Sequence, residues 1–291
     1  MKFTFTIPDS LPEMTVKAFL EEQLLVPRKI RHFLRTKKHI FINQQEVCWN
    51  QTIKAGDECQ LIFDEEDYPP KQIILGNPKL IEEVYQDQYL IIVNKPEGMK
   101  THGNQPNEIA LLNHVSAYVG QTCYVVHRLD KETSGLVLFA KNPFILPILN
   151  QLLEKKEISR EYFALVEGNL PNKNLIFRDK IGRDRHDRRK RIVDSKNGQQ
   201  AETYVTLLKK FQNNSSLVRC RLKTGRTHQI RVHLSHHGHP IIGDPLYNPH
   251  SKSSRLMLHA FKLSFVHPLT LKELSFTALS DTFERELKKY G

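Results

Sequence analysis

The sequence predicts an α+β fold, in which a mixed, largely antiparallel central sheet is flanked by helices and preceded by a small α/β module. Three observations predict it. The chain has 291 residues, 39% of them hydrophobic, which suits either one large domain or a domain carrying a smaller attachment, and allows a sizeable core. Beyond residue 81, strand-like segments outnumber helical ones and do not alternate strictly with them, which disfavours a doubly wound parallel sheet. A charged, proline-containing stretch separates the two parts.

The N-terminal unit is predicted to occupy residues 1–68. Residues 1–9 alternate like an edge strand, and apolar side chains between residues 16 and 24 fall at helical spacing. A second short helix after Pro27 places three arginines together opposite its apolar face: Arg28, Arg31 and Arg35. Residues 40–42 and 46–48 flank the turn-prone Asn43-Gln44, which predicts a hairpin.

Two short helices, a basic helix face and a hairpin together resemble the small RNA-binding module named after ribosomal protein S-four. The resemblance implies that the second helix and the hairpin contact RNA and that Arg28, Arg31 and Arg35 bind its phosphates. A solvated basic helix face is the alternative interpretation. Residues 64–70 combine four acidic side chains with a diproline, which favours extended chain, so we place the domain boundary between residues 68 and 69.

The second unit, residues 69–291, contains several predicted strands and two predicted helices. A helix is expected at residues 144–155 behind Pro143, and another at residues 227–237 that ends at Gly238. A hairpin is expected around residues 256–266. The predicted strands cover residues 89–93, 135–141, 161–167, 202–209 and 217–223.

The positive charge is concentrated in this second unit. The chain carries a formal charge of +11; residues 1–70 hold 9 basic and 11 acidic side chains, whereas residues 71–291 hold 34 and 21. Such a surface attracts polyanions, although solvated lysines explain the charge equally well. Residues 178–191 hold eight basic side chains, and we expect them to form a loop or hairpin at a cleft mouth, with Arg188 and Arg189 following RNA phosphates. A solvated loop is the alternative.

Composition also argues against several other classes of protein. The four cysteines are scattered without a CxxC pair, which indicates free thiols in a reducing compartment. The N-terminus lacks the apolar run of a signal peptide, and no stretch approaches the roughly 18 apolar residues that span a bilayer. We therefore expect a cytoplasmic protein without a membrane partner.

The segment VHRLDKETSGLVL, residues 126–138, contains the side chains best suited to chemistry. Asp130 lies among His127, Arg128 and Lys131 in a loop that leads into an apolar strand. Nearby positive charge favours the ionised carboxylate, which can act as nucleophile or general base. An aspartate that only holds an arginine in place gives the same pattern, so the residues alone leave both interpretations open.

Residues 127–138 closely resemble the signature HRLDxxTSGLL of the RluA family of pseudouridine synthases, with Val137 replacing a leucine. Residues 90–98 resemble the strand and NKPxG turn of that family, residues 160–168 its strand with an active-site tyrosine, and residues 224–234 its TGRTHQIRVHL block. The resemblance spans about residues 80–270. It implies the pseudouridine synthase fold and isomerisation of uridine in structured RNA, with ribosomal RNA expected ahead of transfer RNA.

The resemblance also implies roles for individual residues. Asp130 is the expected catalytic residue, whether it attacks the sugar or base or removes a sugar proton. Arg226 is expected to pair with Asp130, Tyr162 to pack on the uracil, and Arg128 to fill the gap left by a flipped nucleotide. Isomerisation involves no redox change or net group loss, so we expect no cofactor and no metal.

Two other functions remain open from the sequence. One is a non-catalytic RNA-binding or ribosome-assembly factor that keeps the fold, and Asp130→Asn would leave its functions intact. The other is a metal-dependent hydrolase that uses the histidines between residues 228 and 239, which metal analysis would reveal. Nothing in the sequence requires a dimer, so we expect a monomer.

Overall fold

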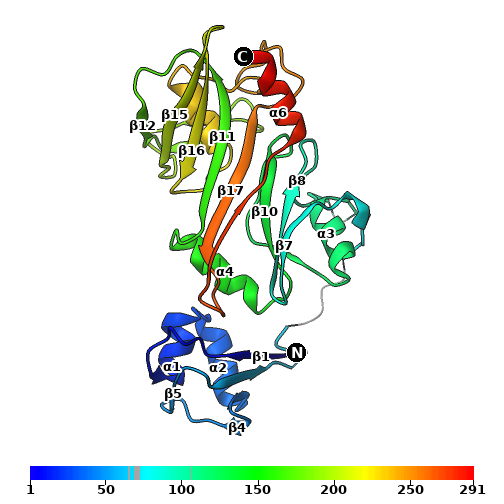
Figure 1. The fold of residues 1–291 in the computed structure, drawn as a ribbon, viewed down its shortest axis with the longest axis vertical. Helices are drawn as coiled ribbons and strands as arrows, with labels where there is room; N and C mark the ends of the chain where they lie inside the picture. Colours follow the sequence, from blue (N-terminus) through cyan, green and yellow to red (C-terminus); the bar gives the residue numbers. More distant parts are fainter. Residues whose placement is uncertain (65, 69–72, 106) are drawn as a thin grey trace.

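The structure is a computed structural model that describes residues 1–64, 66–68, 73–105 and 107–291. A small N-terminal unit lies beneath a larger unit built on one long sheet (Figure 1). The predicted boundary between residues 68 and 69 adjoins residues 69–72, which lie outside the described residues. Among the described helices, none has the length and apolar character needed to cross a membrane.

The N-terminal unit combines short helices with a four-stranded sheet. Its order is β1-β6-β3-β4, where β1 spans Lys2–Thr6, β6 Glu58–Ile62, β3 Ile40–Ile42 and β4 Gln45–Glu46. The predicted edge strand is confirmed, because β1 pairs only with β6 in this sheet. The predicted hairpin forms between β3 and β4, although β4 starts at Gln45. The remaining elements are α1 (Val16–Ala18), the π-helical turn η1 (Phe19–Gln23), α2 (Arg28–Thr36), β2 (Met14–Thr15) and β5 (Thr52–Ile53).

The larger unit contains a ten-stranded, mixed and mostly antiparallel sheet, as the sequence predicts. Its central path runs β12-β15-β16-β11-β17-β10-β8-β7, while β18 pairs with β17 and β9 with β10. Only the β10–β17 pair is parallel. The strands are β12 (Asn174–Phe177), β15 (Thr203–Phe211), β16 (Ser215–Leu222), β11 (Ser159–Glu167), β17 (Leu258–Val266), β10 (Ser134–Ala140), β8 (Leu90–Lys95), β7 (Glu83–Gln86), β18 (Glu273–Thr277) and β9 (Tyr124–Val125).

Helices flank this sheet, and two of them match the predicted ones. These are α4 (Ile145–Glu154) and α5 (Gln229–His236), which is followed by Gly238 at φ 80°. Two others were not predicted, α3 (Leu111–Val119) and α6 (Asp281–Leu287), although both have recognisable ends: Gly120 terminates α3 in the left-handed conformation, and the Ser280 hydroxyl caps α6. The expected hairpin around residues 256–266 is formed by β17 and β18. The short helices are η2 (Pro78–Leu80) and η3 (Lys288–Tyr290).

Gly135 is required where β10 begins. Its φ is +120°, and a Cβ at this position would lie 2.3 Å from the carbonyl oxygen of Ala260 on the parallel strand β17. Only glycine therefore allows the two backbones to approach this closely. This contact fixes the end of the loop that carries Asp130.

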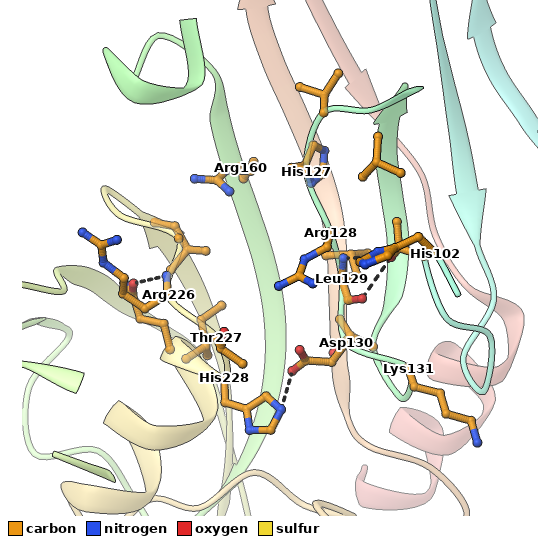
Figure 2. Close-up of a pocket in the computed structure, with 18 of the residues that line it drawn as sticks. His102, His127, Arg128, Leu129, Asp130, Lys131, Arg160, Arg226, Thr227 and His228 are labelled. Atoms are coloured by element: carbon orange, nitrogen blue, oxygen red, sulfur yellow. Dashed lines mark hydrogen bonds and ion pairs between the residues drawn. The ribbon is translucent and has the colours of Figure 1, made fainter. Parts of the chain in front are cut away.

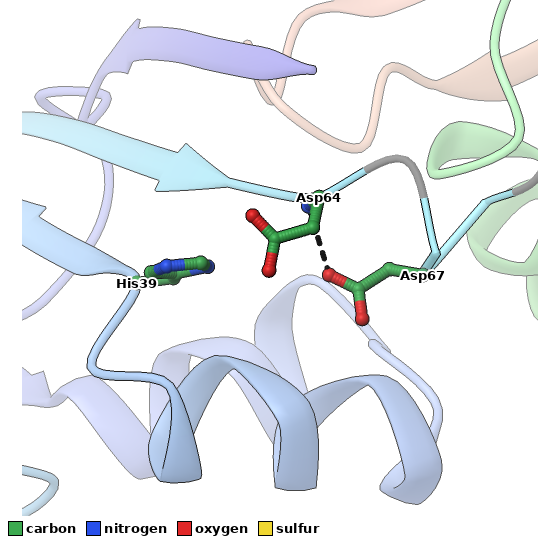
Figure 3. A group of neighbouring side chains, drawn as sticks. All are labelled: His39, Asp64 and Asp67. Carbon is green, nitrogen blue, oxygen red and sulfur yellow. Dashed lines mark hydrogen bonds between the residues drawn. The ribbon is translucent and has the colours of Figure 1, made fainter.

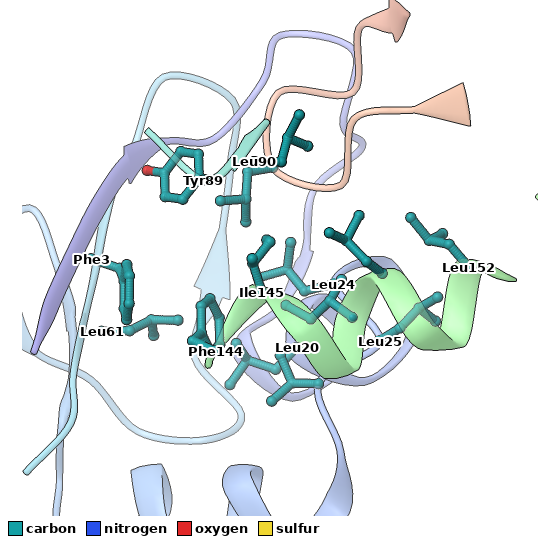
Figure 4. Close-up of a cluster of buried hydrophobic side chains, with 14 of the residues drawn as sticks. Phe3, Leu20, Leu24, Leu25, Leu61, Tyr89, Leu90, Phe144, Ile145 and Leu152 are labelled. Carbon is teal, nitrogen blue, oxygen red and sulfur yellow. The ribbon is translucent and has the colours of Figure 1, made fainter. Parts of the chain in front are cut away.

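The two units share one hydrophobic core. Phe144, at the start of α4, stacks on Phe3 of β1 with ring centroids 5.0 Å apart (Figure 4). The ring centroid of Phe63 lies 5.1 Å from that of Phe144. Leu20 and Leu24 of the N-terminal unit join the same buried cluster. The Tyr89 hydroxyl also donates to the carbonyl oxygen of Thr4 across the junction. The N-terminal unit is thus packed against α4.

Candidate active site

Asp130 lies in a cleft of about 1400 Å³ in the larger unit. The walls are the loop before β10, part of β11, and the segment that leads into α5 (Figure 2). The Asp130 side chain is 26% exposed, so its carboxylate is accessible from the cleft. A cleft of this volume is large enough for a nucleobase, since typical small-molecule sites measure roughly 300–1,000 Å³.

Arg231 is the cation that contacts the Asp130 carboxylate. Its Nη1 donates to Oδ2 of Asp130 at 3.1 Å, while Nε and Nη2 donate to the two carboxylate oxygens of Asp244 at 2.7 and 2.8 Å. Arg231 is 1% exposed and Asp244 fully buried. Burial alone lowers the pKa of the guanidinium, but its hydrogen bonds to Asp244 and the charges of Asp244 and Asp130 raise the pKa above its ordinary value. A fixed cation therefore balances Asp130.

The prediction that Arg226 pairs with Asp130 is wrong. The exposed Arg226 side chain donates through Nε to the carbonyl oxygen of Gln200, and the arginine that reaches Asp130 comes five residues later, from α5. The reason is local: Gln229 anchors the turn by accepting from the Arg226 backbone N–H, which leaves the Arg226 side chain at the rim of the cleft. Arg231 lies in the same sequence block, so the block identified the segment but not the residue.

His228 is a second neighbour of Asp130. Its Nε2 lies 3.7 Å from Oδ2 of Asp130, and its Nδ1 lies 3.0 Å from the hydroxyl of Tyr247. That hydroxyl also accepts from the backbone N–H of Arg191, so Tyr247 links His228 to the basic segment of residues 178–191 and holds the ring with its Nε2 towards Asp130. Burial lowers the pKa of His228, and the charge of Asp130 opposes this only in part. The imidazole is neutral at pH 7.

Two buried side chains fix the backbone of the Asp130 loop through hydrogen bonds. The Thr101 hydroxyl accepts from the Leu129 N–H and donates to the Leu129 carbonyl oxygen. Lys95, which is fully buried, donates to the carbonyl oxygens of Pro96, Met99 and Lys131. Burial lowers its pKa to about 7, against the opposing charges of Asp130, Glu132 and Glu97. Sequence patterns gave no indication of Thr101 or Tyr247.

Tyr162 and Arg128 both line the cleft. Tyr162 is only 5% exposed and lies where the pairing of β11 with β17 shifts register, an irregularity that turns a side chain away from the regular alternation. Burial raises the pKa of its phenol, which keeps it protonated at neutral pH. Arg128 is exposed and projects towards the centre of the cleft (Figure 2).

The peripheral arginines differ in exposure and in their ion pairs. Arg28 and Arg35 are exposed on α2, whereas Arg31 is half-buried and forms an ion pair with Glu21 of the same unit. The basic segment forms a hairpin of β13 (Ile181–Arg183) and β14 (Arg191–Val193). Within it, Arg188 is exposed, and Arg189 lines the cleft while pairing with Asp187.

The histidines between residues 228 and 239 have partners of their own. His233, for example, contacts the Thr203 hydroxyl and the carbonyl oxygen of Asp179. Within the described ranges, the one group of potential metal ligands at suitable distances is His39, Asp64 and Asp67 (Figure 3). The ammonium group of Lys37 lies 2.8 Å from Asp64 and 2.7 Å from Asp67, so a cation already serves these carboxylates.

Comparison with known proteins identifies both units. The sequence profile described as RNA pseudouridylate synthase matches residues 89–236, and the profile described as RluD ribosomal pseudouridine synthase N-terminal domain matches residues 3–59. The chain is 40% identical over 242 residues to "Uncharacterized RNA pseudouridine synthase YhcT" of Bacillus subtilis (strain 168), covering 80% of this chain and 78% of that protein. It is 30% identical over 302 residues to "Ribosomal large subunit pseudouridine synthase C" of Buchnera aphidicola subsp. Schizaphis graminum (strain Sg), covering 95% and 93%.

Solved structures support the same fold. "Human RNA Pseudouridylate Synthase Domain Containing 1" superposes with a TM-score of 0.60 at 24% identity, covering 70% of this chain and 85% of that one. The central sheet and its flanking helices are therefore those of the pseudouridine synthase fold. With the profile and the relatives in agreement, the chain belongs to the RluA-type family of RNA pseudouridine synthases, which are isomerases acting on RNA.

Proposed function

We propose that this enzyme isomerises uridine to pseudouridine in large-subunit ribosomal RNA, with Asp130 as the catalytic residue. One observation carries the assignment: the Asp130 carboxylate is accessible in a cleft that admits a nucleobase, and a fully buried arginine holds it in place. The sequence left open an aspartate that serves only to hold an arginine. Arg231 does not need Asp130 for this, because Asp244 already binds it through both carboxylate oxygens.

The reaction requires three things of the site. The bond between C1′ and N1 breaks, the detached uracil rotates, C5 bonds to C1′ and releases its proton, and N1 takes up a proton. Atoms and oxidation state are conserved, so the site must supply an activating carboxylate, a pocket that retains the base, and positive charge nearby. Asp130 supplies the carboxylate, and Arg231 balances its charge. His228 adds a neutral imidazole beside the same oxygen.

The substrate nucleotide is proposed to enter the cleft flipped out of its stack. C1′ and C5 of a stacked uridine are hidden from protein, and extrusion costs a few kcal/mol. The ring of Tyr162 packs on the uracil, and the exposed Arg128 occupies the position that the base has left. Arg226, at the rim, contacts the RNA strand outside the base pocket.

Ribosomal RNA is the preferred substrate for two reasons. Several relatives are named as ribosomal large subunit pseudouridine synthases, including one of Neisseria meningitidis that is 39% identical over 223 residues. The N-terminal unit also matches the profile of a ribosomal pseudouridine synthase N-terminal domain. We propose that Arg28 and Arg35 on α2, with Arg188 and Arg189 of the β13–β14 hairpin, bind RNA phosphates around the target.

Tritium release from RNA labelled at uridine C5 tests the proposal. The purified protein should release label from an unmodified large-subunit ribosomal RNA transcript and much less from a transfer RNA pool. Asp130→Asn should reduce release at least 10³-fold, a loss of about 4 kcal/mol in transition-state stabilisation, while RNA binding stays within about twofold. Equal release from the variant would exclude Asp130 as the catalytic residue, and preferential release from transfer RNA would exclude the proposed substrate.

A further inference from the structure

Arg160 is a cation of the cleft without an anionic partner. It lies on β11, two residues before Tyr162, and its side chain lines the same cleft as Asp130. Its Nε is sealed from solvent and has no hydrogen-bond partner, and among the described residues no carboxylate forms an ion pair with its guanidinium. The acidic side chain next to it in sequence, Glu161, pairs instead with Arg219.

An unpaired guanidinium in this position is costly for the fold. Buried polar groups are normally paired, and a partly buried charge without a counter-ion loses hydration without compensation. The charge of Arg160 acts on a neighbouring side chain: the pKa of His127 is lowered to about 3, mainly by burial and in part by the positive charge of Arg160. The site therefore has an excess of positive charge that a bound anion would neutralise.

The guanidinium of Arg160 packs closely against the turn at Gly225. A Cβ on Gly225 would lie 3.0 Å from Nη1 and 3.3 Å from Nη2 of Arg160, closer than nearly all real contacts. The turn at Gly225 thus closes over the guanidinium with backbone alone. Figure 2 shows Arg160 at one end of the pocket, between the segment carrying Arg226 and the loop carrying Arg128.

We propose that Arg160 binds a phosphodiester of the flipped nucleotide and so holds that nucleotide in the cleft. The inference rests on the proposed function. A guanidinium presents a planar pair of donors that matches two phosphate oxygens, and an extruded nucleotide brings its own backbone phosphates to the cleft wall. Two residues of extended chain span at most about 7 Å, so the backbone of Arg160 lies within the length of one nucleotide from that of Tyr162, on whose ring the uracil is proposed to pack.

Binding to a large-subunit ribosomal RNA transcript tests this in the Asp130→Asn background, where no turnover occurs. Adding Arg160→Gln should weaken binding about tenfold and reduce the slope of log K against log salt by about 1, because one phosphate contact is lost. Arg160→Lys should retain most of the affinity, since lysine still contacts phosphate. Arg219→Gln is the matched control: its side chain is 46% exposed on the neighbouring strand β16, outside the cleft, and should change binding by less than twofold.

Kinetics in the otherwise wild-type enzyme provide the second readout. Arg160→Gln should raise KM about tenfold and leave kcat within about threefold, with an unchanged thermal unfolding midpoint. Unchanged affinity and salt slope, or a loss of kcat alone, would overturn the phosphate assignment. If wild-type enzyme released no tritium while Arg160→Gln still lowered the salt slope, the proposed reaction would fail and the phosphate contact would stand.

Discussion

The two sides of α4 differ: one packs into a closed apolar junction, and the other borders the cleft with its charged walls. Towards the N-terminal unit, Ile145 and Ile148 join the aromatic cluster around Phe144, and the contact is apolar and closed to solvent. Towards the cleft, Leu146 and Leu153 of the same helix border a space whose other walls carry charged groups. The apolar junction is complete without any ligand, whereas the cleft leaves cations such as Arg160 unpaired.

This contrast separates the residues that stabilise the fold from those that are available to bind RNA. Packing free energy at the junction fixes the position of the exposed arginines on α2 relative to the cleft, because both units share one core. Unpaired charge in the cleft, such as that of Arg160, does not stabilise the fold and remains available for RNA. Variants on the two sides should therefore differ in what they impair: stability at the junction, and binding or turnover in the cleft.

The largest effect is expected at the junction. Phe144→Ala removes a fully buried ring that touches Phe3 and Phe63, and should lower the free energy of unfolding by about 3–5 kcal/mol. At a temperature where the variant is folded, tritium release per folded molecule should stay within about threefold of wild type. Leu208→Ala, on an exposed side chain of β15, is the control and should cost less than about 0.5 kcal/mol. A stable but inactive Phe144→Ala would contradict the separation.

A pH effect on stability is expected from His127, behind the cleft wall. Burial lowers its pKa to about 3, and its Nε2 accepts from the Leu138 N–H, which requires a neutral ring. Between pH 3 and the ordinary value of 6.5, the unfolded chain binds a proton that the folded chain does not. As pH falls through that window, this residue should therefore lower the free energy of unfolding by up to about 1.4 kcal/mol per pH unit.

Denaturant unfolding at pH 5.0 and pH 7.0 measures this contribution. His127→Gln should make the free energy of unfolding depend less on pH, by about 1–2 kcal/mol over this interval. His250→Gln, at an exposed histidine, is the control and should keep the wild-type dependence. Identical pH dependence in His127→Gln and wild type would show that the ring is not held neutral by burial.

A smaller effect is expected from the hydroxyl of Tyr247. Tyr247→Phe removes the group that joins the Arg191 N–H to Nδ1 of His228, so His228 loses the contact that orients it towards Asp130. One hydrogen bond contributes about 0.5–1.5 kcal/mol, which predicts a fall in kcat of about two- to tenfold with RNA affinity unchanged. Tyr118→Phe, on the exposed face of α3, should leave kcat as it is. A change in affinity alone would place Tyr247 in RNA binding instead.

The smallest effect is expected on the outer face of the N-terminal unit. Arg28→Gln and Arg35→Gln should each weaken RNA binding about two- to threefold and lower the salt slope, while kcat at saturating RNA stays the same. Lys54→Gln removes an equal charge from another exposed position of this unit and serves as the control. Equal losses in all three variants would indicate a general charge effect rather than a contact through α2.

Sequence patterns predicted the parts of the molecule that depend on local periodicity or on contiguous blocks. The helix α4, most central strands and the Asp130 loop fall into this group. The arginine that pairs with Asp130 could not be predicted in this way. Arg226 and Arg231 lie in one block, and only the turn held by Gln229 decides which of them points inward. The shared core was likewise hidden: Phe3, Phe63 and Phe144 come from segments that each look like ordinary core-forming sequence, and nothing local indicates that they meet.

The distance along the chain between Asp130 and its partners has a consequence during translation. Arg231 lies 101 residues after Asp130, Asp244 another 13 residues on, and Gly135 contacts Ala260. A ribosome adding about 5–20 residues per second exposes the Asp130 loop well before those partners leave the exit tunnel. A nascent chain therefore cannot assemble a competent site until the segment that reaches Ala260 has left the tunnel.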